Sequence, residues 1–194
     1  LYGDSANRAD SGATSEDRMS VSETYKTLNI ADINKLPKTD TNTPNIQSAT
    51  YYKQDKSYEI ADYTYNYQVG TTTIKSTSAY FYNPVTGTEL KRAKDADQEA
   101  SLARSLNYKG SITVSDSTAF YSTGSVVELL AALTAETYYY GSVKGEEIAD
   151  YSYNYSTNRK TDGTYDPSTK RTTSVYLYGD SANRADSGAT SEDR

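Results

Sequence analysis

The sequence predicts a β-rich α+β protein made of tandem modules, each a tyrosine-rich antiparallel meander packed with one or two helices. An Ig-like sandwich is one form that such a meander can take. Residues 1–18 recur letter for letter as residues 177–194, and shorter stretches recur at half of that spacing. The chain also holds 21 tyrosines, many of which alternate with small or polar residues at the period of two that is typical of strands.

The repeated stretches divide the sequence into two diverged halves. Ile60–Tyr67 reads IADYTYNY and recurs as IADYSYNY at residues 148–155, an offset of 88. After an insertion of eight residues, residues 77–82 match residues 173–178. We therefore assign residues 1–48 as the C-terminal part of one half-repeat with a helix and a linker, residues 49–136 as half-repeat A, and residues 137–194 as half-repeat B.

The duplicated terminal stretch belongs to the repeating unit, because Lys91-Arg92-Ala93 is echoed inside it by Asn183-Arg184-Ala185. Residues 172–176 alternate like a strand and run directly into the second copy, so residue 1 starts within a strand pattern. We expect the chain to be a window of a longer tandem array. The alternative is a subunit with matching ends that exchanges segments with a neighbour.

The first 48 residues are expected to contain a loop, a helix and a linker. Residues 2–12 are rich in Ser, Gly, Asp and Asn, which favour turns. Apolar residues recur near a period of 3.6 over residues 15–36, and Pro37 supplies a stop, so we expect a helix there. The polar, proline-containing residues 38–47 predict a linker.

Two tyrosine-rich meanders follow from the period-two pattern. The expected strands of the first are residues 49–53, 58–69 and 71–82, and those of the second are residues 137–143, 147–157 and 169–178. Residues 83–87 predict a turn that closes the first meander. Asp162-Gly163 and Asp166-Pro167 predict an exposed loop within the second.

Helices and two short strands are expected between the meanders. Residues 94–106 are Ala-rich and carry leucines on one side of a helix. Residues 111–115 and 119–122 predict short strands. Ser125 and Glu128 have the spacing of a capping box, which predicts a buried helix over residues 125–136.

The composition excludes several classes of function. The chain has no cysteine and no histidine, which removes disulfides, thiolate or imidazole metal sites and the commonest general base. A net charge of −6 with mixed signs lacks the basic stripe of a nucleic-acid-binding surface. No run of 18 apolar residues is present to span a membrane. We therefore expect no enzyme, and no catalytic, cofactor-binding or metal-binding residue.

Acidic residues cluster in each half without a specific spacing. Asp95, Asp97 and Glu99 in one half, and Glu146, Glu147 and Asp150 in the other, are candidates for a glycosidase-like carboxylate pair or a calcium site. Because neither pattern has the spacing those sites require, charged faces and turns are the preferred interpretation.

The tyrosines of the two repeated strands are expected to form a ladder on one face of each meander. These residues are Tyr63, Tyr65, Tyr67, Tyr151, Tyr153 and Tyr155. Packing across strands is the preferred interpretation. A sugar-stacking face, dityrosine cross-linking and charge transport along stacked rings are the alternatives.

The sequence therefore favours a structural protein whose partners are further copies of itself. Its composition resembles that of bacterial surface and extracellular repeat proteins in general, so we expect an extracellular or cell-surface filament assembled head to tail through strand edges. The expected interface residues are Leu1, Tyr2, Ala49, Tyr51, Tyr52, Val175, Tyr176, Leu177 and Tyr178, with residues 49–52 as the acceptor edge. The alternative is an adhesin or carbohydrate-binding repeat that presents a tyrosine face to a polysaccharide.

Overall fold

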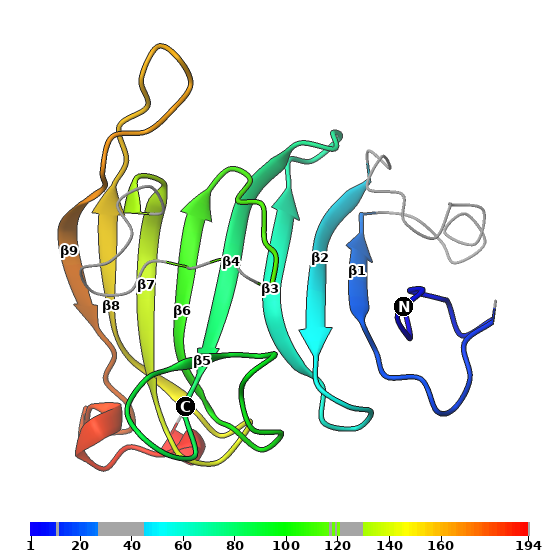
Figure 1. The fold of residues 1–194 in the computed structure, drawn as a ribbon. Coiled ribbons are helices and arrows are strands. Elements are labelled where there is room, and N and C mark those ends of the chain that lie inside the picture. The colour runs from blue at the N-terminus through cyan, green and yellow to red at the C-terminus, as the bar shows by residue number, and fades with distance from the viewer. Residues whose placement is uncertain (11, 27–44, 117, 119, 121–129, 194) are drawn as a thin grey trace.

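The strands form one antiparallel sheet that runs through the whole chain (Figure 1). A computed structural model describes residues 1–10, 12–26, 45–116, 118, 120 and 130–193. Within these residues the sheet has nine strands in the order β1-β2-β3-β4-β6-β7-β8-β9, and the short β5 pairs with β4 away from this path. Strands that follow one another on this path are neighbours, so the sheet is a meander from end to end.

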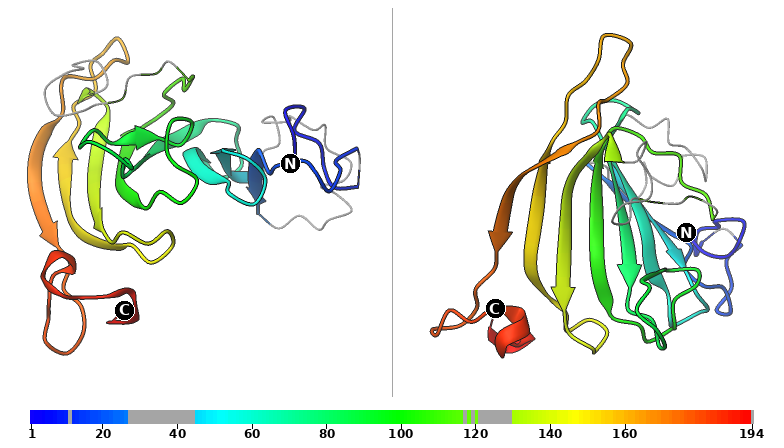
Figure 2. Two further views of the ribbon diagram at one scale, coloured as in Figure 1. Left: turned by 60° about the horizontal axis from the view of Figure 1, so that its bottom comes forward. Right: turned by 60° about the vertical axis from the view of Figure 1, so that its left-hand side comes forward.

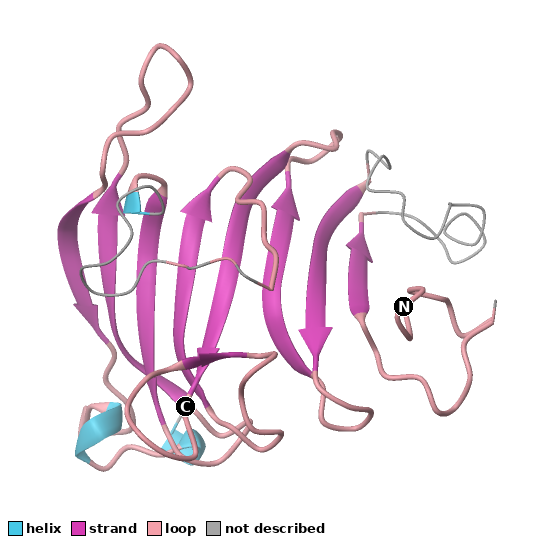
Figure 3. Ribbon diagram, viewed as in Figure 1, coloured by secondary structure: helices cyan, strands magenta, loops and turns pink. Residues whose placement is uncertain are grey.

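The strands are β1 (Val21–Tyr25), β2 (Ile46–Lys53), β3 (Ile60–Tyr67), β4 (Ile74–Tyr82), β5 (Lys91–Arg92), β6 (Leu102–Lys109), β7 (Leu133–Tyr140), β8 (Ile148–Ser156) and β9 (Thr169–Val175). Two single-turn 3₁₀ helices, Ala185–Ser187 and Ser191–Asp193, follow β9. Figure 3 shows how little of the described chain is helical.

The first four strands and the last four long strands are counterparts. Val21 of β1 pairs with Tyr51 of β2 as Arg104 of β6 pairs with Tyr138 of β7. The register shift between β2 and β3 follows Tyr51, and that between β7 and β8 follows its counterpart Tyr138. A bulge adds local twist to a strand pair, and both sets of four strands carry shifts at counterpart positions; Figure 2 shows that the sheet as a whole is curved.

One face of the sheet carries the hydrophobic core. Leu106, Tyr108 and Leu133 are fully buried there, together with Phe81 and Phe120. Residues 110–116, which follow β6, run over this face beside β4 and β3 (Figure 1). Their backbone meets the sheet where the hydroxyl of Tyr65 donates to the carbonyl of Ile112 at 3.0 Å. A single sheet therefore buries its apolar side under its own connecting segments.

The opposite face carries hydroxyl and amide groups that bond from strand to strand. The hydroxyl of Thr64 lies 2.9 Å from that of Thr50 and 3.2 Å from that of Tyr80. The hydroxyl of Ser78 donates to the Asn107 side chain at 2.6 Å. These bonds satisfy polar groups that the neighbouring side chains cover.

The β-rich prediction is confirmed, and the strands expected for the two meanders correspond to β2, β3, β4, β7, β8 and β9. The expected exposed loop lies between β8 and β9 and projects from the end of the sheet (Figure 1). The sandwich is not what these residues form, because all nine strands belong to a single sheet.

The helix predictions are wrong for most of the residues concerned that the structure describes. Residues 102–106, expected in a helix, belong to β6, and residues 133–136 belong to β7. Residues 21–25, expected in the first helix, form β1. Leucine and alanine favour helices only weakly, and pairing of these segments with β-rich neighbours outweighs that preference.

Parts of the expected helices cannot be compared with the structure. Residues 27–36 of the first helix and residues 125–129 of the last lie outside the described residues. Leu130, where the description resumes, is helical, and β7 begins three residues later at Leu133.

The short strands expected between the meanders are not confirmed. Residues 111–115 are irregular and cross the core face, while most of residues 119–122 lie outside the described residues. The expected linker falls largely in residues 38–44, which also lie outside them, and Ile46 already begins β2.

Candidate functional site

Three related segments connect strands or extend them at the two ends of the sheet. They are the β4–β6 connection, which contains β5, the N-terminal copy (residues 1–18) and the C-terminal copy (residues 177–194). In the N-terminal copy, Tyr2 and Asn7 exchange backbone hydrogen bonds of 2.6 and 2.7 Å. Tyr178 and Asn183 do the same at 2.8 and 3.0 Å. The two copies therefore share a local fold.

The β4–β6 connection is anchored by a buried ion pair. Arg92 donates through Nε to Asp62 at 3.0 Å and through Nη2 to the second carboxylate oxygen, and Asp62 is fully buried. Burial raises the pKa of Asp62, and the Arg92 guanidinium opposes that rise. The hydroxyl of Tyr82 donates to the carbonyl of Ala61 at 2.6 Å, and Ala93 is fully buried.

The C-terminal copy makes the same contacts with β8, the counterpart of β3. Arg184 donates to Asp150 through Nε at 3.1 Å and through Nη2 at 2.5 Å, and these bonds raise the pKa of Arg184. The Tyr178 hydroxyl donates to the carbonyl of Ala149 at 2.6 Å, and Ala185 is fully buried. Unlike Arg92, which is 8% exposed, the Arg184 side chain remains 39% exposed.

The N-terminal copy contacts the strand that follows it instead. The Leu1 amino group donates to the carbonyl of Val21 at 2.7 Å, and Val21 N donates to the Leu1 carbonyl at 3.3 Å. This matches the pairing of Phe81 with Arg104 in the β4–β6 connection. Within the described residues, Arg8 has a buried Nη1 without a hydrogen-bond partner, and the neighbouring Ala9 is exposed.

Among the strands that the structure describes, the two outermost are β1, beside which Leu1 pairs with Val21, and β9. Val175, Tyr176 and Leu177 expose 50%, 38% and 58% of their surface at the β9 end. Tyr176 N donates to the carbonyl of Asp150 on β8. Because amides alternate in direction along an antiparallel strand, the amides of Val175 and Thr173 point away from β8, toward the open edge.

The expected interface residues are thus only partly at an edge. Leu1 and Tyr2 lie beside β1, and Val175, Tyr176, Leu177 and Tyr178 lie at or just after β9. The acceptor edge expected at Ala49, Tyr51 and Tyr52 is wrong. These residues belong to β2, which is paired on one side with β1 and on the other with β3. The sequence pattern placed β1 in a helix, so the expected edge was β2, one strand after the outermost described strand β1.

The expected tyrosine ladder joins a tyrosine from the neighbouring strand. Tyr51 stacks on Tyr63 with ring centroids 4.4 Å apart and planes 14° apart, and Tyr65 meets both rings edge on. In the second half Tyr138 stacks on Tyr151 at 4.7 Å and 20°. The two clusters occupy counterpart positions, which indicates a repeated packing element.

Burial dominates the electrostatics of this ladder. It raises the pKa of Tyr67 to about 12 and raises the pKa of Tyr63 and of Tyr138. Tyr155 donates its hydroxyl to buried Glu136 at 2.9 Å, and Lys170 Nζ lies 3.1 Å from the centroid of the Tyr153 ring. These contacts engage the ladder in packing and hydrogen bonding.

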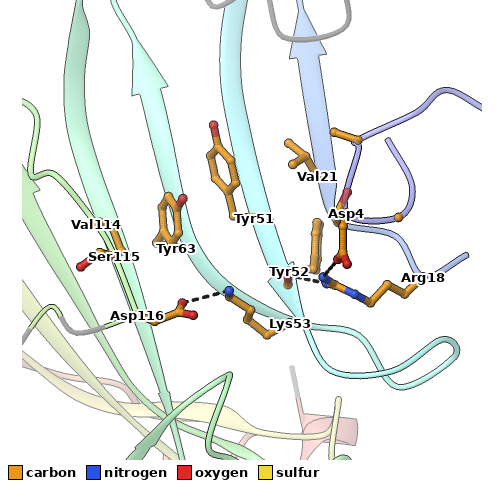
Figure 4. Close-up of a pocket in the computed structure, with 13 residues that line it drawn as sticks. Asp4, Arg18, Val21, Tyr51, Tyr52, Lys53, Tyr63, Val114, Ser115 and Asp116 are labelled. Carbon is orange, nitrogen blue, oxygen red and sulfur yellow. Dashed lines mark hydrogen bonds and ion pairs between the residues drawn. The ribbon is translucent and has the colours of Figure 1, made fainter.

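A pocket of about 310 Å³ opens beside the first tyrosine cluster (Figure 4). Tyr51 and Tyr63 line it together with four charged side chains that form two ion pairs. Arg18 Nη2 contacts Asp4 at 2.8 Å, and Lys53 Nζ contacts Asp116 at 2.9 Å. Tyr52 lines the pocket as well, so three tyrosines lie beside two ion pairs.

The acidic clusters are engaged in structural contacts. Glu147 accepts from the amide of Leu102 at 2.7 Å and from that of Gly145 at 2.9 Å, and Asp150 binds Arg184. Asp97 accepts from the amide of Glu99 at 3.0 Å. Within the part of the chain that the structure describes, no group of three or more acidic, His or Cys residues could hold a metal ion. None of the helical segments described has the length and hydrophobicity of a membrane-spanning helix.

Sequence reasoning missed the two arginine–aspartate pairs and the role of Tyr51. The signal was present, because Asp62 and Asp150 recur at the repeat offset and Arg92 and Arg184 recur in the echoed triplets. Charged residues that recur together in both halves of a repeat are candidates for a shared contact. Pairing them requires knowing that the connection folds back on β3 or β8, which the sequence does not state.

Comparison with known proteins yields no relative, since no family model, no curated protein and no solved structure matches this chain.

Proposed function

We propose that this chain is a structural repeat of an extracellular fibre, whose copies join head to tail through the edges of their sheets. One observation carries the proposal. β1 is the counterpart of β6, and β9 is the counterpart of β4, while β4 and β6 pair with each other in the middle of the sheet. The two free edges of the chain are therefore counterparts of two strands that already fit together.

Such a contact extends without closing on itself. The β9 edge of one copy meets the β1 edge of the next, so the two surfaces are different and every copy leaves one edge free at each end. Strand edges are well suited to this use, because backbone groups on an unpaired edge bond readily to an added strand. The product is a continuous curved sheet to which each copy adds its eight strands β1–β4 and β6–β9, counted over the described residues.

The carboxylates and tyrosines that could have formed an active site already make structural contacts, which also favours a structural role over an enzyme. Asp150 and Glu147 are held by Arg184 and by backbone amides, and the tyrosines of the ladder are packed against each other. The extracellular location is part of the proposal and rests on the composition, which is rich in Tyr, Ser and Thr.

Electron microscopy of a protein with four copies joined at the repeat spacing tests this function. A continuous sheet predicts particles of uniform width whose length grows in proportion to the number of copies. Separate globules joined at variable angles would contradict it, because a sheet that is paired across each junction cannot bend freely there.

The pocket in Figure 4 favours an adhesin or carbohydrate-binding repeat as the second candidate. Tyrosine faces flanked by hydrogen-bonding ion pairs suit a sugar ring. Calorimetric titration with neutral oligosaccharides distinguishes the two candidates. Saturable heat that disappears in the Tyr63→Ala variant supports the adhesin, whereas the fibre repeat predicts no saturable heat.

A further inference from the structure

The two ends of the chain display complementary parts of one junction. At the junction between β4 and β6, one segment contacts Asp62 and Ala61 of the preceding strand β3, and we call these the backward contacts. The same segment pairs with the following strand β6, which is the forward contact. The C-terminal copy makes only the backward contacts, to Asp150 and Ala149. The N-terminal copy makes the forward contact, in which Leu1 pairs with Val21.

We infer that a second copy of this chain binds the β9 edge in one fixed register, with a single shared 18-residue segment making both sets of contacts. This inference rests on the proposed function and specifies its interface. In it, Leu1 of the second copy takes the position of Leu177 of the first, and β9 continues directly into it. The arginine at position 8 of the second copy then meets Asp150 of the first.

The register follows from the internal junction. Ala79 pairs with Leu106 and Ser78 pairs with Asn107. Through the repeat, Ala79 corresponds to Val175 and Leu106 to Glu23. Val175 therefore pairs with Glu23 of the second copy, and Ser174 pairs with Thr24. Leu1 already pairs with Val21 in this register.

The hydrogen-bond directions agree with this register. The amide of Gly110 donates to the carbonyl of Lys75, so these two residues form a hydrogen-bonded pair. Such pairs recur at every second residue of an antiparallel ladder, which makes Ala79 and Leu106 a hydrogen-bonded pair as well. Their counterparts are Val175, whose amide points to the open edge, and Glu23. Both edges thus present donors and acceptors at matching positions.

Side chains on both faces also find partners in this arrangement. On the core face, Leu177, which is more than half exposed in the single chain, comes to lie opposite Val21, while the half-exposed Val175 lies opposite Glu23 and diagonal to Val21. On the polar face, Ser174 and Thr24 take the places of Ser78 and Asn107, whose side chains are hydrogen-bonded at 2.6 Å. The series of hydroxyl contacts therefore continues across the junction.

In the single chain, the N-terminal copy lacks two contacts that its counterparts make: a covered alanine and an arginine bound to a carboxylate. Ala93 and Ala185 are fully buried, whereas their counterpart Ala9 is exposed. Arg92 and Arg184 each bind a carboxylate through two nitrogens, whereas Arg8 has a buried Nη1 without a hydrogen-bond partner and its Nε lies 3.4 Å from Asp10. Asp150 of a preceding copy supplies the partner, and the end of its β8 covers Ala9.

Disulfide trapping tests the register, because the chain contains no cysteine of its own. The protein carries residues 1–176 followed directly by a full copy 1–194, with Ser174→Cys in the first copy and Thr24→Cys in the second. Cα atoms in a non-hydrogen-bonded antiparallel pair are about 4.5 Å apart, within reach of a disulfide. We expect oxidation to join the two cysteines as fast as it joins Cys replacements of Ser78 and Asn107 in the single chain.

A register control uses Ser174→Cys with Ser22→Cys, which moves the second cysteine by two positions on the same face. The inference requires this pair to oxidise at least tenfold more slowly. Equal rates for the two pairs, or no disulfide in either, would overturn it. If the two copies still form one continuous particle by electron microscopy, the failure concerns the register alone. If they separate into independent globules, the proposed function fails as well.

Discussion

Arg92 and Arg184 bind their aspartates through the same two nitrogens, but in different surroundings. Asp62 is fully buried and its partner Arg92 is 8% exposed, whereas the Arg184 side chain is 39% exposed. A buried carboxylate that loses its only cation keeps the cost of desolvation without the compensating attraction. Asp150 is also buried, but its partner Arg184 is partly exposed, and a pair with one exposed member is better screened by water and contributes less. The same contact therefore has different importance at its two positions.

Alanine substitutions at the three counterpart arginines test this ranking by urea denaturation. Arg92→Ala is expected to lower the free energy of unfolding by about 3–5 kcal/mol, because it leaves Asp62 buried and unpaired. Arg184→Ala is expected to cost clearly less. Arg8→Ala, the matched control, is expected to leave stability nearly unchanged in the single chain, since its Nη1 has no hydrogen-bond partner there. A cost for Arg8→Ala equal to that for Arg92→Ala would contradict the assignment.

Tyrosine alternation predicts a ladder face because side chains along a strand alternate between two faces, and the rings of Tyr63 and Tyr65 do meet edge on. The tyrosine of the neighbouring strand that stacks on the ladder could not be predicted from this alternation. Tyr51 stacks on Tyr63 because β2 and β3 pair in one particular register, with a shift after Tyr51. Register depends on the turn and on both strands together, so the alternation in one strand does not reveal it.

At the scale of elements, the sequence predicted six strands and missed β1, β6 and the short β5. Both β1 and β6 were expected within helices, since apolar residues recur there at helical spacing. β6 contains Arg104 at a buried position, where it pairs with Glu136 of β7 across the sheet. In the sequence alone, a charged residue among apolar ones is interpreted as lying on the polar side of an amphipathic helix. Only the partner strand shows that it is an internal ion pair.

Proline substitutions on β9 separate the stability of the chain from the pairing of copies. Thr173→Pro removes an amide that points toward the open edge, so the single chain should unfold at nearly the same urea concentration as the parent. In the protein with two joined copies, the same substitution in the first copy should abolish the disulfide between the cysteines introduced by Ser174→Cys and Thr24→Cys. Urea titration and non-reducing gels measure the two effects.

The neighbouring position provides the matched control. Ser174 alternates with Thr173, so its amide points toward β8, and Ser174→Pro removes a bond of the β8–β9 ladder. This variant should destabilise the single chain more than Thr173→Pro does. If Thr173→Pro proves the more damaging of the two in the single chain, then the assigned direction of the amides is wrong.

At the scale of the whole molecule, strands β1–β4 and their counterparts β6–β9 do not form separate domains. A repeat of about 88 residues is long enough for an independent domain, and the sequence therefore suggested modules joined by linkers. The structure joins strands β1–β4 to their counterparts β6–β9 by pairing β4 with β6 over seven residues of each strand. This pairing is invisible in the sequence because it links a tyrosine-rich strand to a segment without that pattern.

In a continuous sheet, one core cluster can draw on both sets of strands. The core cluster around Leu106 draws on β4, β6 and β7, and so on both halves. The cluster around Ile46 at the β1 end includes Leu1, the residue that takes the place of Leu177 of a preceding copy. Each half is thus completed by its neighbour, as expected of a repeat whose units are stabilised by the contacts between them.

The most direct measurement is hydrogen exchange of the β9 amides in the protein with two joined copies, compared with the single chain. Peptides covering residues 169–176 have the same sequence in both copies, so they are measured together. If β1 of the second copy pairs with β9 of the first, these peptides should split into two equal populations. One should exchange its outward amides slowly, like the paired β4, and the other as fast as in the single chain. A single fast population would contradict the central claim that the copies join in one sheet.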